Sequence, residues 1–517
     1  MTTATATPPT SHTRVSPYEE LLALVKDANL LASSAALLSW DQEVMMPDAG
    51  IELRGRQLAQ LEKLSHEQAT SSRIGELLAL CEKDASLTKD KHSVESVNLR
   101  EIRHRYDRKT KLPSSLVEEQ ALLSSYGQHA WAEARRNSDF NHFKPWLEKI
   151  VDLLRRKAEC LGWSAGGEPW DALAEDYEPG CTAKDVQAVF APLRERLQKL
   201  LGELMNAPRQ PSNAFNETKL PIDQQEKFVR FIAGSIGFDF KRGRLDRSTH
   251  PFCSGTHCND VRLTTRFHED NLNDALGSTM HECGHGIYEQ GLLLEHVGTP
   301  MGDSISLGIH ESQSRMWENQ VGRSRAFWKW AYPKLQEHFG DGVKQLSMDD
   351  VYEGANIVKP DFIRVEADEA TYNMHIMIRF EIERALLKGE LKVADIPGVW
   401  NAKYKEYLGI DVPDNRRGCL QDIHWSMVSM GYFPTYTLGN LYAAQFFEKA
   451  MVDMPDLYSQ FERGEFSALK TWLNTHIHAH GKRYHAGELC ERVTGKPLSA
   501  EPLMRYLEGK LRPIYGL

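Results

Sequence analysis

The sequence predicts a mainly α protein with two helical lobes and a small β element near its middle. The 517 residues exceed the roughly 250–300 at which a single hydrophobic core stops growing, so two lobes are expected. Apolar residues recur three and four positions apart through most of the chain, which is the spacing of half-buried helices. Alternation of β-branched and polar residues is clear only in DVRLTTRF at 260–267, which predicts a strand there.

Helices are expected along both halves of the chain. Pro17 stands in a first helical turn, where proline is favoured. Residues 1–16 are rich in Thr, Ala and Pro and are expected to form a disordered tail. The loose stretch at 206–223 separates the predicted lobes, 17–222 and 223–517. The segments with the clearest helical periodicity are 17–40, 51–70, 143–163, 185–204, 370–391, 467–477 and 503–511.

The composition is that of a soluble globular protein, with 41% hydrophobic and 26% charged residues. The net charge of −10 argues against nucleic acid or an anionic membrane surface as a partner. We expect no membrane-spanning segment, because no apolar run approaches the roughly 18 residues needed to cross a bilayer. Eight scattered cysteines do not form a disulfide framework, and the N-terminus lacks a secretory signal. Both observations favour a cytoplasmic location.

The stretch NDALGSTMHECGHGIYEQG at 273–291 carries two histidines, His281 and His285, four positions apart. On a helix they share one face about 6 Å apart, so they can bind one tetrahedral Zn²⁺. Glu282 lies about 100° around the axis and can act as a general base without being a ligand. The alternative is a chance histidine pair on an exposed face, but the uncharged neighbours favour a buried site.

Spacing alone leaves the third ligand open. Glu289 continues the stripe of the two histidines but lies about 9 Å along the axis from their midpoint, too far for its side chain. The segment LGIHESQSRMWENQ offers His310, Glu311 and Glu318 on an expected second helix. Because His310 and Glu311 point about 100° apart, one of them is expected to face elsewhere.

Six motifs follow one another along the chain: HPF (250–252), DVRLT (260–264), HECGH (281–285), HESQ (310–313), IRVEAD (363–368) and GCLQDIHW (418–425). In this order they resemble the carboxypeptidase Taq family of metallocarboxypeptidases. SWDQEVMMP and YEPG, early in the chain, are also similar to that family.

The resemblance implies a helical, zincin-like metallopeptidase fold of the gluzincin type. Its N-terminal lobe would cover a deep central groove, and its second lobe would carry the metal. The resemblance also implies a homodimer, and it implies Glu311 as the third metal ligand beside His281 and His285.

The predicted activity is zinc-dependent removal of single C-terminal residues from peptides, with Glu282 as the base. Co²⁺ and Mn²⁺ are alternative metals that the sequence does not separate from Zn²⁺. His424 and Tyr436 are similar to the His and Tyr groups of related helical zinc peptidases and are expected to stabilise the oxyanion. The alternative for Tyr436 is a structural aromatic wedged in a loop bounded by Gly and Pro.

An exopeptidase must recognise the free α-carboxylate of its substrate, and an arginine does so with two parallel hydrogen bonds. We expect Arg364 in IRVEAD to have this role, with a salt bridge to Glu366 or Asp368 as the alternative. Arg262 is the second candidate, and its alternative role is to fix the β element at the groove edge. His250 is expected to hold the substrate or line its pocket.

Several points stay open at this level. Asp368 is a candidate partner for the second ring nitrogen of a metal-binding histidine. Cys253 and Cys258 lie outside the family pattern, and we expect free thiols rather than a second zinc site with His257. Rival functions are a zinc oligopeptidase or dipeptidyl carboxypeptidase and, more distantly, an inactive helical binding protein. The preferred C-terminal side chain is not determined.

Overall fold

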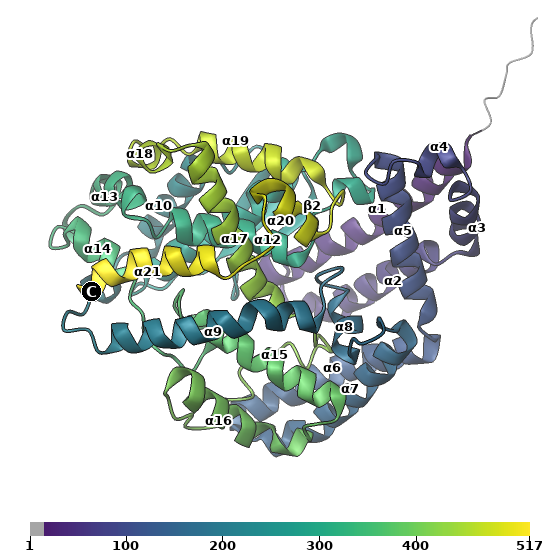
Figure 1. Ribbon diagram of the computed structural model, residues 1–517, viewed down its shortest axis with the longest axis horizontal. Coiled ribbons are helices and arrows are strands. Elements are labelled where there is room, and N and C mark those ends of the chain that lie inside the picture. Colours follow the sequence, from purple (N-terminus) through teal and green to yellow (C-terminus); the bar gives the residue numbers. More distant parts are fainter. Residues whose placement is uncertain (1–14) are drawn as a thin grey trace, which may run out of the picture.

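The computed structural model describes residues 15–517 and is built almost entirely from helices (Figure 1). Helices make up 68% of the protein and strands 3%, which confirms the predicted mainly α class. Of the predicted tail, residues 1–16, only Val15 and Ser16 lie within the described part of the chain. Ser16 and Glu19 form a capping box in front of Pro17, so the first helix begins where the sequence indicates.

All seven segments with helical periodicity form helices. They are α1 (Pro17–Val44), α2 (Ile51–Ala69), α7 (Phe140–Leu161), α9 (Ala183–Met205), α15 (Tyr372–Lys388), α19 (Ser467–His476) and α21 (Glu501–Tyr515). Two more helices carry the HECGH and HESQ motifs, as expected: α11 (Leu272–Gly291) and α12 (Leu307–Arg315).

Further helices complete the body around these elements. They are α3 (Ser72–Cys81), α4 (Ala85–Thr88), α5 (Val94–Lys111), α6 (Ser114–Asn137), α8 (Pro169–Ala174), α10 (Ile222–Ser235), α13 (Arg325–Phe339), α14 (Met348–Gly354), α16 (Ile396–Leu408), α17 (Pro434–Asp453), α18 (Leu457–Glu462) and α20 (Ala486–Thr494). In Figure 1 α1 to α5 gather at one end of the molecule, and α12 and α17 lie near its centre.

The small β element is a three-stranded sheet of β1 (Gly243–Arg247), β2 (Cys253–His257) and β3 (Asp260–Thr265), in the order β1-β3-β2. β1 runs parallel to β3, and β2 runs antiparallel to it. The predicted strand at 260–267 is thus confirmed as β3. The other two strands were not foreseen because GRLDR and CSGTH are short and lack the apolar alternation that indicates a half-buried strand.

Two glycines let α11 approach its neighbours closely. A Cβ at Gly284 would lie 2.4 Å from the carbonyl oxygen of Gln313 on α12, and a Cβ at Gly286 would lie 2.9 Å from the Leu263 side chain on β3. Glycine costs a helix about 1 kcal/mol relative to alanine, so its place here follows from tertiary packing. α11 is therefore pressed between the sheet and α12.

One large hydrophobic core extends from Leu116 to Tyr515 and crosses the predicted boundary between lobes at residue 222. α9, from the N-terminal side of that boundary, packs against α15 and α21 from the other side. A smaller core joins α1, α3 and α5 around Leu21 and Leu77. The division into lobes at 222/223 stays a prediction, and the shared core unites the two parts.

The expectation of no segment long and apolar enough to cross a membrane was wrong for α1. An 18-residue window of this helix has a mean hydropathy of 1.5, which meets that criterion by length and composition. Only 17% of that window is buried, and α1 contacts α2, α3 and β2. Near the end of α1, the Trp40 ring lies 4.9 Å from the guanidinium carbon of Arg244 and 4.4 Å from that of Arg262. These cation–π contacts attach α1 to the sheet.

Glu178, from the YEPG motif, connects the N-terminal half of the chain to α12. Its carboxylate accepts hydrogen bonds from the Gly308 N–H (2.8 Å) and from the Ser306 hydroxyl (3.0 Å), so it caps the first turn of that helix. The side chain is buried and forms no ion pair with any residue of 15–517. Burial raises the pKa of Glu178 from 4.5 to about 7.

Glu178→Gln should make stability less dependent on pH. Because the folded pKa of about 7 lies above the ordinary 4.5, the unfolded chain loses this proton first, and the wild type loses stability as pH rises through this interval. Glutamine removes the charge and keeps one of the two acceptor oxygens, and its amide can donate to the Ser306 hydroxyl oxygen. We therefore expect the variant to unfold at a higher temperature than the wild type at pH 8, with the difference shrinking at pH 5. Thermal unfolding followed by circular dichroism measures this.

The control is Glu118→Gln on α6, where the glutamate is exposed. This variant should track the wild type at both pH values. An equal shift of the Glu178→Gln variant at pH 5 and pH 8 would show that the raised pKa plays no part.

Candidate metal centre

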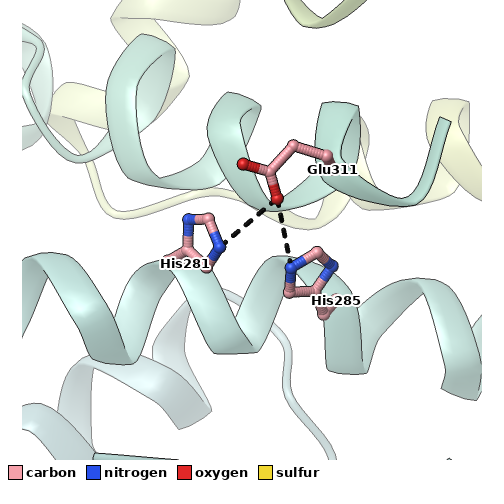
Figure 2. A group of neighbouring side chains, drawn as sticks. All are labelled: His281, His285 and Glu311. Atoms are coloured by element: carbon pink, nitrogen blue, oxygen red, sulfur yellow. Dashed lines mark ion pairs between the residues drawn. The ribbon is translucent and has the colours of Figure 1, made fainter. Parts of the chain in front are cut away.

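His281, His285 and Glu311 lie together where α11 passes α12 (Figure 2). The Nε2 atoms of His281 and His285 lie 3.5 and 3.4 Å from the same oxygen of Glu311, Oε2. Ligand atoms that bind a tetrahedral ion at about 2.1 Å are themselves about 3.4 Å apart, so these three residues fit one such ion. Figure 2 shows both imidazoles directed at that oxygen. The structure thus brings together the three residues that the resemblance indicates.

The other candidate ligands contact the outer ring nitrogens of the two histidines. Glu318 Oε2 lies 2.9 Å from His281 Nδ1. His310 Nδ1 lies 2.5 Å from His285 Nδ1, and its Nε2 lies 2.7 Å from Oε1 of Glu289. Glu318 belongs to a π-helical stretch, Met316–Val321, that continues α12. π-Helical turns occur frequently at functional sites, and nothing in the local sequence indicates this one.

Asp368 does not support either histidine, so the suggestion that it contacts one was wrong. Its carboxylate accepts hydrogen bonds from the N–H and hydroxyl of Thr371 and from the N–H of Lys359. These bonds fix the chain just before α15 begins. A position in a shared motif does not determine where a side chain points, and here backbone groups of its own segment occupy the carboxylate.

Glu311 is held by charge and by close packing. Arg315 donates from Nε to its Oε1 (2.7 Å), which leaves Oε2 toward the histidines. α17 packs closely against the same side chain, because a Cβ at Gly439 would lie 2.5 Å from Cγ of Glu311. Arg315 was not foreseen from the sequence, although four residues after Glu311 is the spacing at which helical side chains meet.

Glu282 is 6% exposed and lines both cavities that flank the cluster. Burial raises the pKa of Glu282 to about 7, and the nearby carboxylate of Glu311 adds to the effect. Although burial opposes it, Arg315 and His281 hold the pKa of Glu311 far below its ordinary value. Burial lowers the pKa of His285 to about 3, which keeps this imidazole in the neutral form that binds metals.

Two cavities meet at the cluster, and His281, Glu282, Pro251 and Tyr436 line both of them. The larger has a volume of about 710 Å³. The smaller, of about 520 Å³, includes Cys253 in its wall. A chain bound across the junction would pass directly over the metal position, which is the arrangement that the expected groove requires.

His424 and Tyr436 are brought together, with the Tyr436 hydroxyl 3.2 Å from His424 Nε2. Burial, together with the charge of Arg364, lowers the pKa of His424 to about 3, so the ring is neutral at physiological pH. Burial also raises the pKa of the Tyr436 phenol, which keeps its proton. Tyr436 lies in the first turn of α17 and lines both cavities, and its role in catalysis stays a prediction.

Arg364 lies in the wall of the larger cavity and is 6% exposed. It pairs with neither Glu366 nor Asp368, so the alternative proposed for it had the wrong partners. Its Nε donates to Asp422 and its Nη1 to the Tyr372 hydroxyl, both at 2.8 Å.

The two remaining substrate-site candidates are placed differently. Arg262 donates from Nε and Nη2 to the Asp260 carboxylate, both at 2.9 Å, and lies against Trp40. It lines neither cavity beside the cluster. Its contacts with Asp260 and Trp40 instead favour its alternative role, which is to fix the β element. Its role in substrate binding stays a prediction. His250 lines the larger cavity, next to Pro251.

Cys253 and Cys258 are both free thiols, as expected. Cys253, in the wall of the smaller cavity, is partly buried, and Cys258 is buried. Burial raises the pKa of the Cys253 thiol well above its ordinary value, so it stays protonated at neutral pH.

A helical body that carries two histidines and a glutamate at metal-binding distances, with a buried glutamate beside them, defines a metallopeptidase-type centre. The comparison with known families agrees. The chain belongs to the carboxypeptidase Taq (M32) metallopeptidase family, whose model matches residues 20–511. Its enzyme class is therefore metallocarboxypeptidase.

Named relatives cover almost the whole chain. It is 43% identical over 506 residues to thermostable carboxypeptidase 1 of Thermus thermophilus, and the match covers 96% of this chain and 99% of that relative. It is 38% identical to carboxypeptidase 1 of Bacillus subtilis, with 97% and 99% covered. Among solved structures, the M32 carboxypeptidase of Deinococcus radiodurans superposes with a TM-score of 0.93 at 36% identity and with 97% and 100% coverage.

Proposed function

We propose that this metallocarboxypeptidase uses zinc to remove single residues from the C-termini of peptides. The observation that carries the proposal is the His281–His285–Glu311 cluster at the junction of two cavities, with Glu282 beside it. Two imidazoles and one carboxylate at tetrahedral spacing are the donor set of catalytic zinc sites. Imidazole donors suit Zn²⁺ better than Mn²⁺, and tetrahedral spacing is the usual geometry of zinc sites, so we propose zinc as the metal.

Glu282 is proposed as the general base. A divalent cation held by His281, His285 and Glu311 would polarise the peptide carbonyl and make water a stronger acid. The Glu282 carboxylate accepts a proton from the attacking water and passes it to the leaving amine. Burial raises the pKa of Glu282 to about 7, and a positive charge at the cluster would lower it again. The base is then ionised at neutral pH.

Tyr436 is proposed to stabilise the oxyanion, assisted by His424. The imidazole is neutral, and only its Nε2 has a partner, because Nδ1 is buried without one. We assign the ring proton to Nε2, which donates it to the phenol oxygen. The phenol is then free to donate its own proton to the carbonyl oxygen on which negative charge develops.

Arg364 is proposed to bind the α-carboxylate of the substrate in the larger cavity. Asp422 and Tyr372 occupy its Nε and Nη1, whereas its Nη2 has no hydrogen-bond partner among residues 15–517. Asp422 also holds the guanidinium in place, so little side-chain entropy is lost when a carboxylate binds. His250 lies in the same wall and is proposed to contact the C-terminal residue.

Removal of single residues requires a free carboxylate on the substrate. We expect peptides with a free C-terminus to be shortened one residue at a time, and their C-terminal amides to be resistant. The measurement is mass spectrometry of a mixed peptide pool digested by the zinc-loaded protein. Comparable cleavage of amides would favour an oligopeptidase, and loss of residues in pairs would favour a dipeptidyl carboxypeptidase.

Glu282→Gln tests the base. The amide has nearly the same shape but cannot accept the proton, so we expect kcat to fall by about 10²–10⁴-fold. Because Glu282 is not among the proposed ligands, zinc should still bind with one ion per chain. The two readouts are peptide hydrolysis and zinc content after gel filtration. Full activity in this variant would show that another group accepts the proton.

We also propose a cytoplasmic homodimer. All eight cysteines are free, which suits a reducing compartment. α1, α2 and the segment between them expose several large apolar side chains, including Leu30, Met45, Ile51 and Leu53, and a partner chain could cover them. Sedimentation velocity should give twice the 58.8 kDa of one chain. A single species at the mass of one chain would exclude the dimer.

A further inference from the structure

A line of side chains leads away from the metal cluster on the far side of His285. His310 Nδ1 lies 2.5 Å from His285 Nδ1, and His310 Nε2 lies 2.7 Å from Glu289 Oε1. The two imidazole rings are 4.6 Å apart with 36° between their planes. α11 supplies His285 and Glu289, which are four residues apart, and α12 inserts His310 between them.

The proton positions along this line follow from the geometry of the cluster. His285 presents Nε2 to Glu311 at 3.4 Å, so Nε2 must carry the lone pair that binds a metal. The single proton of the neutral ring is then on Nδ1, which donates to His310 Nδ1. His310 in turn carries its proton on Nε2 and donates it to the Glu289 carboxylate. Only one arrangement of protons satisfies all three contacts.

The other histidine of the cluster is supported differently. His281 Nδ1 contacts the Glu318 carboxylate directly, at 2.9 Å. Arg315 and Arg323 both pair with Glu318, at 3.3 and 3.0 Å, and reduce its effective charge. Glu289 pairs with no lysine or arginine of residues 15–517, and its only ion-pair contact is His310. The full charge of Glu289 is therefore available to polarise the two imidazoles.

We propose that His310 and Glu289 are positioning residues that fix the tautomer and orientation of His285 for metal binding. This inference rests on the proposed metal site and goes beyond its three ligands. A metal-binding histidine usually donates its second nitrogen to a carboxylate or a carbonyl. Here the His310 imidazole lies between His285 and the Glu289 carboxylate and provides the same support. α12 thereby contributes the ligand Glu311, and its neighbouring residue His310 holds the ligand His285 of α11.

The test measures metal binding rather than activity. Metal-free wild type, His310→Phe, His310→Asn and Glu289→Gln are titrated with Zn²⁺ against a chromophoric chelator, and the visible absorption of each Co²⁺ form is recorded. We expect His310→Phe to raise the zinc dissociation constant by about 10–100-fold and to change the Co²⁺ spectrum. His310→Asn should recover much of the affinity, because its Oδ1 occupies the place of Nδ1 and can accept from His285. Glu289→Gln should fall between wild type and His310→Phe.

His478→Gln is the matched control for packing. Both rings lie against Tyr288, with centroid distances of 5.1 Å for His310 and 4.8 Å for His478. His478, however, contacts Gln313 and Asn474 rather than a proposed metal ligand. This control should lower thermal stability with little change in zinc affinity. Equal losses of affinity in His478→Gln and His310→Phe would attribute the effect to packing and overturn the inference.

The remaining outcomes separate this inference from the proposed function. If the wild type binds no zinc, the proposed function fails. If the wild type binds zinc and both His310→Phe and Glu289→Gln bind it equally tightly, with unchanged Co²⁺ spectra, only the positioning role fails. Should His310→Phe not fold, Glu289→Gln decides, because this partly exposed side chain keeps its shape.

Discussion

The close approach of α11 and α12 is the constraint on which the centre depends. A side chain at Gly284 would meet backbone atoms of Gln313 and Ser314 at 2.4–2.5 Å and would force the helices apart. The Nε2 to Oε2 distances of 3.4 and 3.5 Å would then increase beyond what one ion can span. Gly439 on α17 allows a second close approach, against Glu311. α12 thus packs against two helices that each present a glycine to it.

The buried carboxylates of the site are of two kinds: those paired with arginine, and one that has no arginine partner. Glu311 and Glu318 both pair with Arg315, and their pKa values lie far below the ordinary range despite burial. Glu282 has no such arginine, so burial dominates and its pKa rises to about 7. Neighbouring carboxylates with pKa values pushed apart by their surroundings are the pattern of a site in which one carboxylate carries protons and the others are fixed.

The N-terminal half contributes to the centre although no proposed ligand or catalytic residue comes from it. Glu178 caps α12 through Ser306 and Gly308, and Gly308 is three residues before Glu311. Trp40, at the end of α1, lies against the two arginines of the sheet on which α11 packs. Both contacts cross the position at which the sequence suggests a boundary between lobes. The parts are better described as two sets of helices that share one core and stabilise one site.

The sequence by itself determined what depends on local periodicity. It determined the helical class and a strand within 260–267. It also determined the pair His281 and His285 with Glu282 beside it, because residues four apart on a helix share a face whatever surrounds them. Only the tertiary structure decided the relations between elements. It paired Arg364 with Asp422, 58 residues away, and placed Glu318 and His310, rather than Asp368, behind the histidines. Such contacts arise where separate segments of the chain pack together, so the spacing of residues along the sequence does not show which side chains meet.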